Sequence, residues 1–305
     1  MKTQLAAHKP TSGIRFLKHS RLYFWGLLFL IPEIVIFCVF LWKPIIMGIY
    51  YSLHDINFIR GNTFVGLQNY REIIQDEAFY TAIGNTLWFV FLGLVMGYWV
   101  PAVAATAISE LRKFKATARL VVYLPNIVPA VALYGMWRWL YEPIGPVNDF
   151  LTIFQLPPVE WLTDKSVAMF SIVLMNTWHY FGSTALIYLA AVMNIPKDLY
   201  EAAEIDGAGI WQRIKYITLP SIRHIFLLML IMQLIANSQS YEPQLAMTGG
   251  GPNEATTTYM LLVVDGAFKQ FAFGKASAMG VLLFVTLTLL SILLYALQRK
   301  GGDES

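Results

Sequence analysis

Residues 80–108, YTAIGNTLWFVFLGLVMGYWVPAVAATAI, contain no Asp, Glu, Lys, Arg or His. A hydrocarbon layer about 30 Å thick is crossed by roughly 20 helical residues, so this run is long enough to span a membrane. Residues 276–297 are equally free of these side chains. Two such uncharged runs in one chain are not expected of buried helices in a soluble protein, and they indicate an integral membrane protein.

The composition supports the same class. The chain has 305 residues, of which 57% are apolar and only 13% are charged, far from the balance of a soluble domain. Because only helices and closed barrels satisfy the backbone in lipid, we expect an all-α bundle with six transmembrane helices. The expected spans are Leu22–Leu41, Tyr80–Ile108, Leu120–Leu140, Val167–Met193, Ile225–Met247 and Ala276–Leu297.

No internal repeat divides the chain, so residues 22–297 are expected to form one domain between a tail at 1–21 and a tail at 298–305. Basic residues of short loops stay in the cytoplasm. With the N-terminus inside, 15 Lys and Arg fall on cytoplasmic segments and 7 on outer ones. Both termini are therefore expected in the cytoplasm, in a multi-pass membrane protein. The net charge of +3 is explained by this topology and does not indicate nucleic-acid binding.

Three prolines, Pro101, Pro125 and Pro129, fall inside expected spans, where each removes a backbone donor and favours a kink. Three outer loops are longer than the others. Residues 52–78, 141–166 and 248–275 each predict a short helix, and the last begins with TGGGP. These loops are interpreted either as packing lids on the bundle or as a docking surface for an external partner.

The segment Glu201–Pro220, EAAEIDGAGIWQRIKYITLP, is charged although it lies between two apolar spans. Residues 197–223 carry eight ionisable side chains, which would cost on the order of 20 kcal/mol in a bilayer core. The segment is thus expected in the cytoplasm. Pro196 and Asp198 favour a helix start, Asp206-Gly207 indicates a turn, and a second short helix is expected to end at Pro220.

The spacing of E-A-A, Gly207 and I-x-L-P in this segment resembles the EAA loop of the membrane subunits of bacterial ABC importers. The resemblance implies a type I importer permease of the MetI-like fold, with residues 195–221 forming the coupling helices that dock on an ATP-hydrolysing subunit. The matched positions implied to dock are Glu201, Ala202, Ala203, Asp206, Gly207, Ile217, Leu219 and Pro220.

Other stretches resemble the sugar-permease branch of these importers, in particular its maltose-permease half: VGLQNY (65–70), LPNIVPAVALYGMWRWLYEPIGPVN (124–148) and MTGGGP (247–252). The resemblance covers residues 22–297 and implies a carbohydrate importer working by alternating access. It also implies a heterodimer with a second permease, two ATPase subunits that bind ATP and magnesium, and an extracytoplasmic solute-binding protein.

This chain has no G-x-x-x-x-G-K-[ST] phosphate loop, so we expect it to be a permease subunit without an ATPase or a cofactor of its own. Cys38 is the only cysteine and the five histidines are scattered, which predicts no disulfide and no metal site. The alternatives are a carrier driven by an ion gradient, for which inverted repeats are not evident, and a membrane enzyme, for which no nucleophile and base are recognised.

Two polar stripes are candidates for the substrate pathway. Asn176, Tyr180 and Ser183 recur at i, i+4, i+7 in the fourth expected span, and Gln233, Asn237 and Ser240 repeat that spacing in the fifth. Amides and hydroxyls suit a sugar, which exchanges its water for protein hydrogen bonds. The alternative is that these side chains join neighbouring helices.

Glu33 and Glu242 are acids within or at the edge of expected spans. Such groups suggest a functional site. Each lies beside a proline, however, and we expect a structural role, either with a kinked backbone or with the partner subunit.

Overall fold

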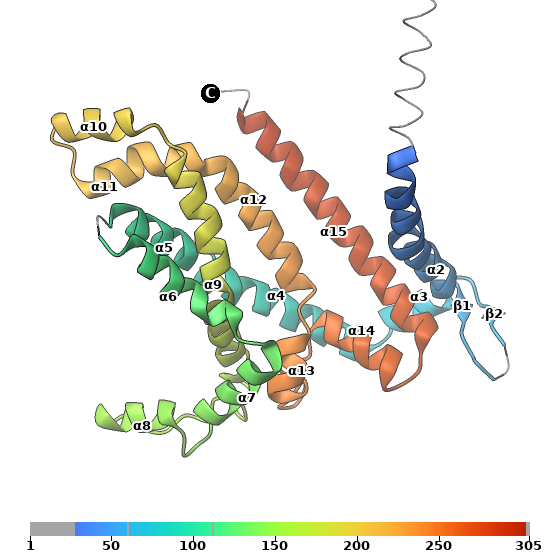
Figure 1. Cartoon of the computed structure of the whole chain (residues 1–305). Coiled ribbons are helices and arrows are strands. Elements are labelled where there is room, and N and C mark those ends of the chain that lie inside the picture. Colours follow the sequence, from blue (N-terminus) through green and yellow to red (C-terminus); the bar gives the residue numbers. More distant parts are fainter. Residues whose placement is uncertain (1–27, 60, 112, 303–305) are drawn as a thin grey trace, which may run out of the picture.

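The structure, a computed structural model, describes residues 28–59, 61–111 and 113–302, and of residues 297–302 the backbone alone (Figure 1). The described elements are η1 (Cys38–Trp42), α2 (Lys43–Ser52), β1 (His54–Asp55), β2 (Thr63–Phe64), α3 (Gln68–Ile74), α4 (Glu77–Gly97), α5 (Trp99–Glu110), α6 (Lys115–Ile127), α7 (Ala130–Leu140), α8 (Pro146–Ile153), α9 (Ala168–Met193), α10 (Lys197–Ile205), α11 (Ile210–Arg213), η2 (Ile214–Thr218), α12 (Leu219–Ser238), α13 (Glu242–Thr248), α14 (Tyr259–Phe268) and α15 (Phe273–Gly302), where η marks a π-helical turn.

The expected all-α class is confirmed. Helices long and apolar enough to cross a membrane run over Leu28–Ser52, Glu77–Glu110, Ile210–Ser238 and Phe273–Ala296, and the bent pair α6–α7 makes up to five. The remaining expected span is α9, which is 26 residues long but falls outside that apolar set. Its polar side chains, including Asn176 and His179, explain the difference. The expected tail at 1–21 lies outside the described residues, and α15 extends the last helix to Gly302.

Two of the expected spans are broken, and a third is interrupted at a single residue. α6 and α7 meet at 91°, with Pro129 at the break, so the kink expected there is confirmed. Pro129 has no N–H and an extended ψ, and it begins α7 as the N-cap. α4 and α5 are separated at Tyr98, three residues before Pro101, and the fifth span breaks at Gln239–Tyr241 before α13.

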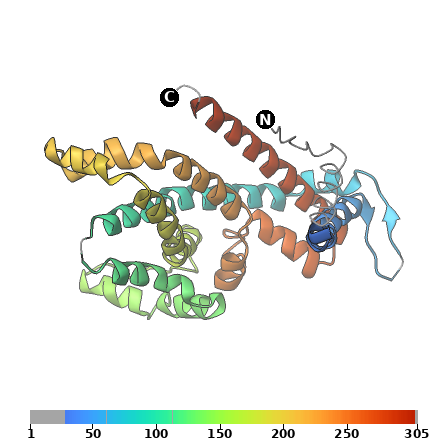
Figure 2. The same cartoon turned by 45° about the horizontal axis from the view of Figure 1, so that its top comes forward.

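α9 is the central helix of the bundle. Twelve of its residues are buried, and α4, α5, α6 and α12 all contact it. α4 and α5 follow one another along α9 and α12 (Figure 2). At Gly182 the helix lies so near α6 that a methyl group would overlap the carbonyl of Val122. Only glycine permits this approach.

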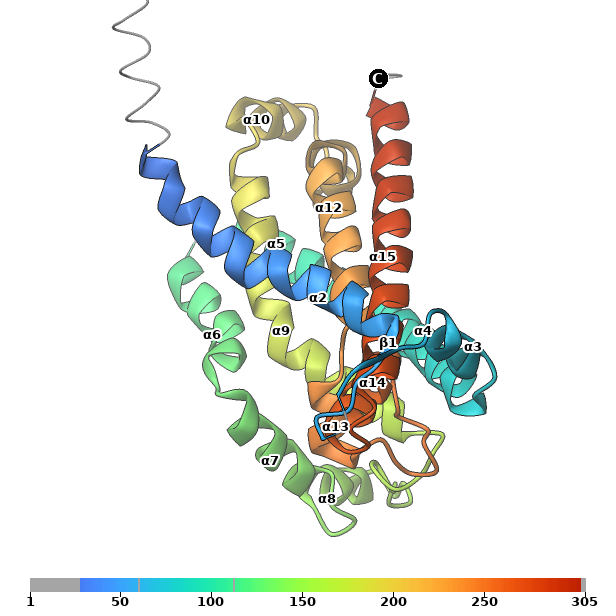
Figure 3. The same ribbon diagram turned by 90° about the vertical axis from the view of Figure 1, so that its right-hand side faces the viewer.

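The first helix lies at the edge of the molecule, where α2 packs along α15 (Figure 3). The two ends of the bundle differ. α10 and α11 project from one end, whereas α7, α8 and α13 lie at the other (Figures 1 and 3).

The helices expected in the long loops are confirmed as α3, α8 and α14. The β1–β2 hairpin, in which His54 pairs with Phe64, is an addition that the sequence patterns do not predict. Asn69 of α3 ties this region together by donating to the carbonyls of Ser52 and His54 at 2.9 and 3.1 Å. In TGGGP, Gly249 and Gly250 have positive φ, as the glycine-rich turn requires.

Candidate functional site: a polar cavity and a projecting helical turn

A cavity of about 530 Å³ lies between α4, α9, α12 and the start of α13, with α7 at one side. Both polar stripes line it. All six residues predicted for the substrate pathway are brought together there: Asn176, Tyr180, Ser183, Gln233, Asn237 and Ser240.

Two glycines of α4 form the wall opposite the α12 stripe. A methyl group at Gly93 would overlap Nδ2 of Asn237, and at Gly97 it would lie 3.1 Å from Nε2 of Gln233. Gln233 Nε2 donates to the carbonyl of Gly93 at 2.8 Å. The absence of side chains on α4 therefore lets the amides of α12 reach its backbone.

The six residues differ in how free their polar atoms are. Gln233 joins α12 to α4, which is the helix-joining role left open by the sequence. Ser183 donates to the Tyr180 carbonyl, and Ser240 donates to Gln244 Oε1. By contrast, Asn237 is 92% buried and its Nδ2 has no hydrogen-bond partner among the described residues. A buried amide donor without a partner costs about 1–3 kcal/mol. This donor faces Gly93 of α4, where there is no room for an added methyl group.

Further lining residues were missed by the sequence patterns. Tyr134 enters from α7, and Tyr241 and Glu242 enter at the break before α13. Gly93 and Gly97 form a G-x-x-x-G spacing, a signal of close helix contact that points to this wall of the cavity. The α12–α13 break coincides with the polar run SQSYEPQ (238–244), which contains a proline and is a signal for it.

The helix-turn-helix expected over residues 195–221 is confirmed. α10 has Asp198 in its first turn and ends at Asp206, and Gly207 turns the chain with φ of +78°. Pro196 caps α10 rather than occupying its first position. Gly209 then begins α11, and its N–H donates to Gln212 Oε1 at 2.8 Å. The turn thus follows from local chemistry.

The expected end of the second helix at Pro220 is wrong. Helical structure runs without interruption from Ile210 to Ser238, and Pro220 lies in the first turn of α12. The π-helical turn η2 precedes it, and there the Leu219 N–H bonds to the Ile214 carbonyl. The wider turn accommodates Pro220, which has no backbone N–H to donate. Ser221 Oγ donates to the Ile217 carbonyl at 2.6 Å. The projecting segment and the fifth span are consequently one rod.

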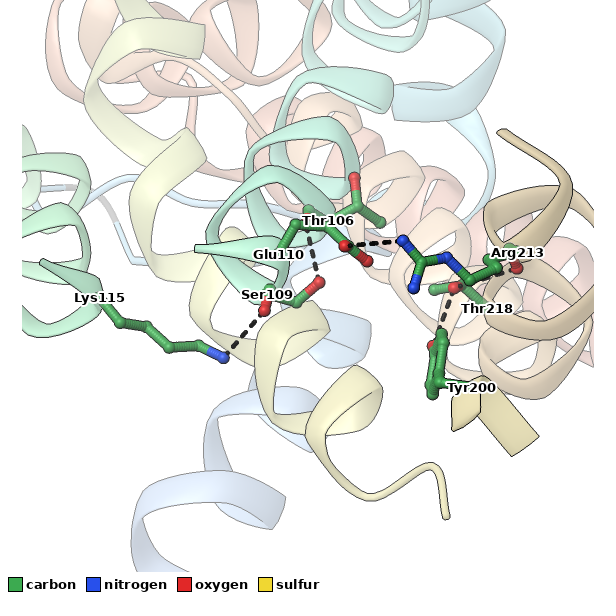
Figure 4. A network of polar contacts seen from close by, with 7 residues as sticks. All are labelled: Thr106, Ser109, Glu110, Lys115, Tyr200, Arg213 and Thr218. Carbon is green, nitrogen blue, oxygen red and sulfur yellow. Dashed lines mark hydrogen bonds and ion pairs between the residues drawn. The ribbon is translucent and has the colours of Figure 1, made fainter. Parts of the chain in front are cut away.

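Polar contacts attach this segment to the bundle (Figure 4). Arg213 Nη2 lies 3.5 Å from Glu110 Oε2 at the end of α5, and Tyr200 Oη lies 2.9 Å from Thr218 Oγ1. The first contact links α11 to α5, and the second links α10 to η2. Neither α10 nor α11 has a buried residue.

The predicted docking residues are mostly accessible. Glu201, Ala202, Asp206, Gly207, Leu219 and Pro220 are exposed, whereas Ala203 and Ile217 are partly buried. Two apolar side chains outside the motif are far more exposed than Leu219, which is 39% exposed: Ile205 at 86% and Trp211 at 83%. A projecting segment that presents such side chains is typical of a protein interface.

Within the part of the chain that the structure describes, no group of three or more His, Cys, Asp or Glu residues is arranged to hold a metal ion. Cys38 is exposed on the first helix.

Residues 90–301 match the sequence family described as "Binding-protein-dependent transport system inner membrane component". The chain belongs to this family. As a binding-protein-dependent inner-membrane component, it is a permease subunit of an ABC importer and a multi-pass protein of the inner membrane. The matched region includes the cavity helices α9 and α12 and the whole projecting segment.

Among curated proteins, this inner-membrane component is 32% identical over 280 residues to the "Trehalose/maltose transport system permease protein MalF" of Thermococcus litoralis, covering 91% of this chain and 95% of that one. Among solved structures, it resembles a chain of a bacterial ABC transporter involved in import of the acidic polysaccharide alginate, with a TM-score of 0.83, 26% identity and coverage of 94% and 99%. That transporter is also solved with an alginate pentasaccharide-bound periplasmic protein, where the TM-score is 0.82 at 26% identity, covering 94% of this chain and 96% of that one.

Proposed function

We propose that this permease subunit forms one half of the pathway by which an ABC importer moves a carbohydrate across the cytoplasmic membrane. The observation that carries the proposal is the convergence of both polar stripes on one cavity. The saccharide transport of its relatives supports the same substrate class.

The cavity has the chemistry that a sugar requires. A sugar that leaves water loses hydrogen bonds at each hydroxyl, and a buried unsatisfied hydroxyl costs about 1–3 kcal/mol. Asn176 and Asn237 offer amides, while Tyr134, Tyr180 and Phe181 offer aromatic faces that cover the apolar C–H surface of a ring. A volume of about 530 Å³ lies within the range of small-molecule sites.

The proposed assembly contains a second, similar permease, two ATPase subunits and an extracytoplasmic solute-binding protein. ATP and magnesium are bound by the ATPase subunits, and this chain needs no cofactor of its own. We place both termini and the α10–α11 segment in the cytoplasm, because Lys and Arg accumulate on that side. The cavity entrance near α13 then faces outward.

The coupling mechanism follows from the continuity of the rod. When ATP closes the ATPase pair, the docked α10–α11 segment moves, and η2 transmits the displacement to α12. Because α12 carries Gln233 and Asn237, the same movement opens the cavity to one side of the membrane or the other. The difference in ATPase binding between the two states supplies the coupling free energy.

Two substitutions test the docking role, Glu201→Lys and Gly207→Leu. Glu201 is exposed, and Gly207 has positive φ with no atom within 4 Å of an added Cβ. We expect both variants to insert normally but to lose the ATPase during purification of the tagged complex from its native membranes. ATP-dependent uptake of radiolabelled neutral oligosaccharides into vesicles should fall with it. Glu160→Lys, an exposed acid of the opposite end, is the control.

Normal complex and normal uptake in both variants would refute the docking role. Uptake by the purified chain alone, abolished by an uncoupler, would establish the ion-driven carrier instead. Covalent turnover of a sugar by the isolated chain would establish an enzyme.

A further inference from the structure

Glu242 is the one charged side chain among the residues that line the described cavity. The other lining residues are apolar, aromatic, amide or hydroxyl side chains, and no Lys, Arg or His is present among them. The sequence suggests a structural role for Glu242 beside Pro243. The structure instead places the carboxylate at the α12–α13 break, in the same lining as Ser240 and Tyr241.

The Glu242 carboxylate has no bonding partner among the described residues. No hydrogen bond or ion pair engages it in the described ranges, and the residue is exposed. Tyr134 and Tyr180 line the same cavity from α7 and α9. A structural carboxylate would be expected to cap a backbone N–H or pair with a base, and this one does neither.

The position of the charge has a chemical consequence. A carboxylate accepts hydrogen bonds from two hydroxyls and attracts an ammonium group, whereas it repels a second carboxylate or a phosphate. The low-dielectric walls of a partly enclosed cavity strengthen both effects. A neutral hydroxyl-rich ligand is therefore favoured over an anionic one of the same shape.

We propose that Glu242 is the charge filter of this cavity, and that the cavity takes a neutral or amine-bearing sugar and rejects uronic acids and sugar phosphates. The inference rests on the proposed function and adds the charge class of the substrate. Glu242 accepts sugar hydroxyls at the α13 end of the cavity.

The charge of the cavity can be measured without knowing the sugar. In a Cys38→Ser background, Gln239→Cys puts a single thiol in the exposed part of the lining, three residues from Glu242. The complex in nanodiscs is treated with a cationic (trimethylammonium-ethyl) or an anionic (sulfonato-ethyl) methanethiosulfonate. The ratio of the two labelling rates is normalised to that of a free thiol, and the neutral methyl reagent reports access.

We expect Glu242→Gln to lower the cationic-to-anionic ratio about tenfold and Glu242→Lys to invert it. Glu254→Gln, which removes an exposed acid outside the cavity lining, should leave the ratio unchanged. A ratio that stays the same in Glu242→Gln, or that falls equally in Glu254→Gln, would overturn the charge filter.

Uptake measurements distinguish a failure of the proposed sugar pathway from a failure of the charge filter. Asn176→Leu and Asn237→Leu each remove an amide from the cavity lining. Normal oligosaccharide uptake in both variants would refute the pathway itself. If uptake is lost in these two variants but Glu242→Gln leaves the labelling ratio unchanged, the charge filter alone is refuted.

Discussion

The cavity and the projecting α10–α11 segment are joined by the continuous helical rod Ile210–Ser238 but maintain their structures by different means. α9 buries twelve residues, and its glycine contact with α6 allows no added methyl group. α10 and α11 bury none, and depend on local caps and a few polar contacts. The cavity is shaped from within the chain, whereas the segment leaves Ile205 and Trp211 exposed.

This difference separates two kinds of sensitivity. A substitution near the cavity should alter the folded chain itself. A substitution on the projecting segment should leave the isolated chain unchanged and act on assembly.

The largest effect is expected for Gly182→Ala. Its Cβ would overlap the Val122 carbonyl, a backbone atom that moves only with α6, so we expect a loss of at least about 3 kcal/mol of stability. Size-exclusion chromatography after heating in detergent measures the fraction that stays folded. Gly84→Ala is the matched control, because an added Cβ there meets nothing within 4 Å. Equal melting of the two variants would contradict the packing.

The next effect concerns assembly. Trp211→Ala removes an indole that is 83% exposed, so the isolated chain should melt normally. If the indole is an interface anchor, its loss costs about 2 kcal/mol or more of ATPase binding, which is over tenfold in affinity. Quantitative pull-down from detergent measures this loss. Val131→Ala, equally exposed on α7, should have no effect.

A smaller effect is expected for the Glu110–Arg213 pair. The two side chains are 36% and 16% exposed and 3.5 Å apart, so their coupling should be at most about 1 kcal/mol. A double-mutant cycle with Glu110→Gln and Arg213→Gln measures it through the melting temperature. A coupling of several kcal/mol would show that α11 is held to α5 far more firmly than the segment's exposure suggests.

The smallest effect is a dependence on pH. Lys275 donates to Glu72 of α3 and lowers the pKa of that carboxyl below its usual value. The contribution of this ion pair to stability is therefore complete above the pKa that Glu72 has in the unfolded chain. It is lost as pH falls through the lower pKa that Glu72 has in the folded chain. Because both groups are largely solvated, about 0.5 kcal/mol is expected. The difference between the melting temperatures at pH 7 and pH 4 should be slightly smaller in Glu72→Gln than in the unaltered chain. An equal difference in the two proteins would contradict this.

Sequence patterns predict the helices, the turn at Gly207 and six of the polar residues that line the cavity. They succeed there because helical spacing places i, i+4 and i+7 on one face. They fail at Pro220, since a proline tolerated by a π-helical turn looks the same in sequence as one that ends a helix. They single out Glu242 as a boundary acid but do not place it in the cavity, because only the break between α12 and α13 brings this residue there.

The central claim is that the α10–α11 segment is the contact through which a separate ATPase acts on the cavity. A photo-crosslinking amino acid at position 211 in native membranes tests this most directly, with position 131 on α7 as the equally exposed control. We predict that position 211 captures an ATP-hydrolysing subunit, in a yield that changes when ATP is added, and that position 131 does not. Failure of position 211 to capture any such subunit, while the complex still imports its sugar, would contradict the account.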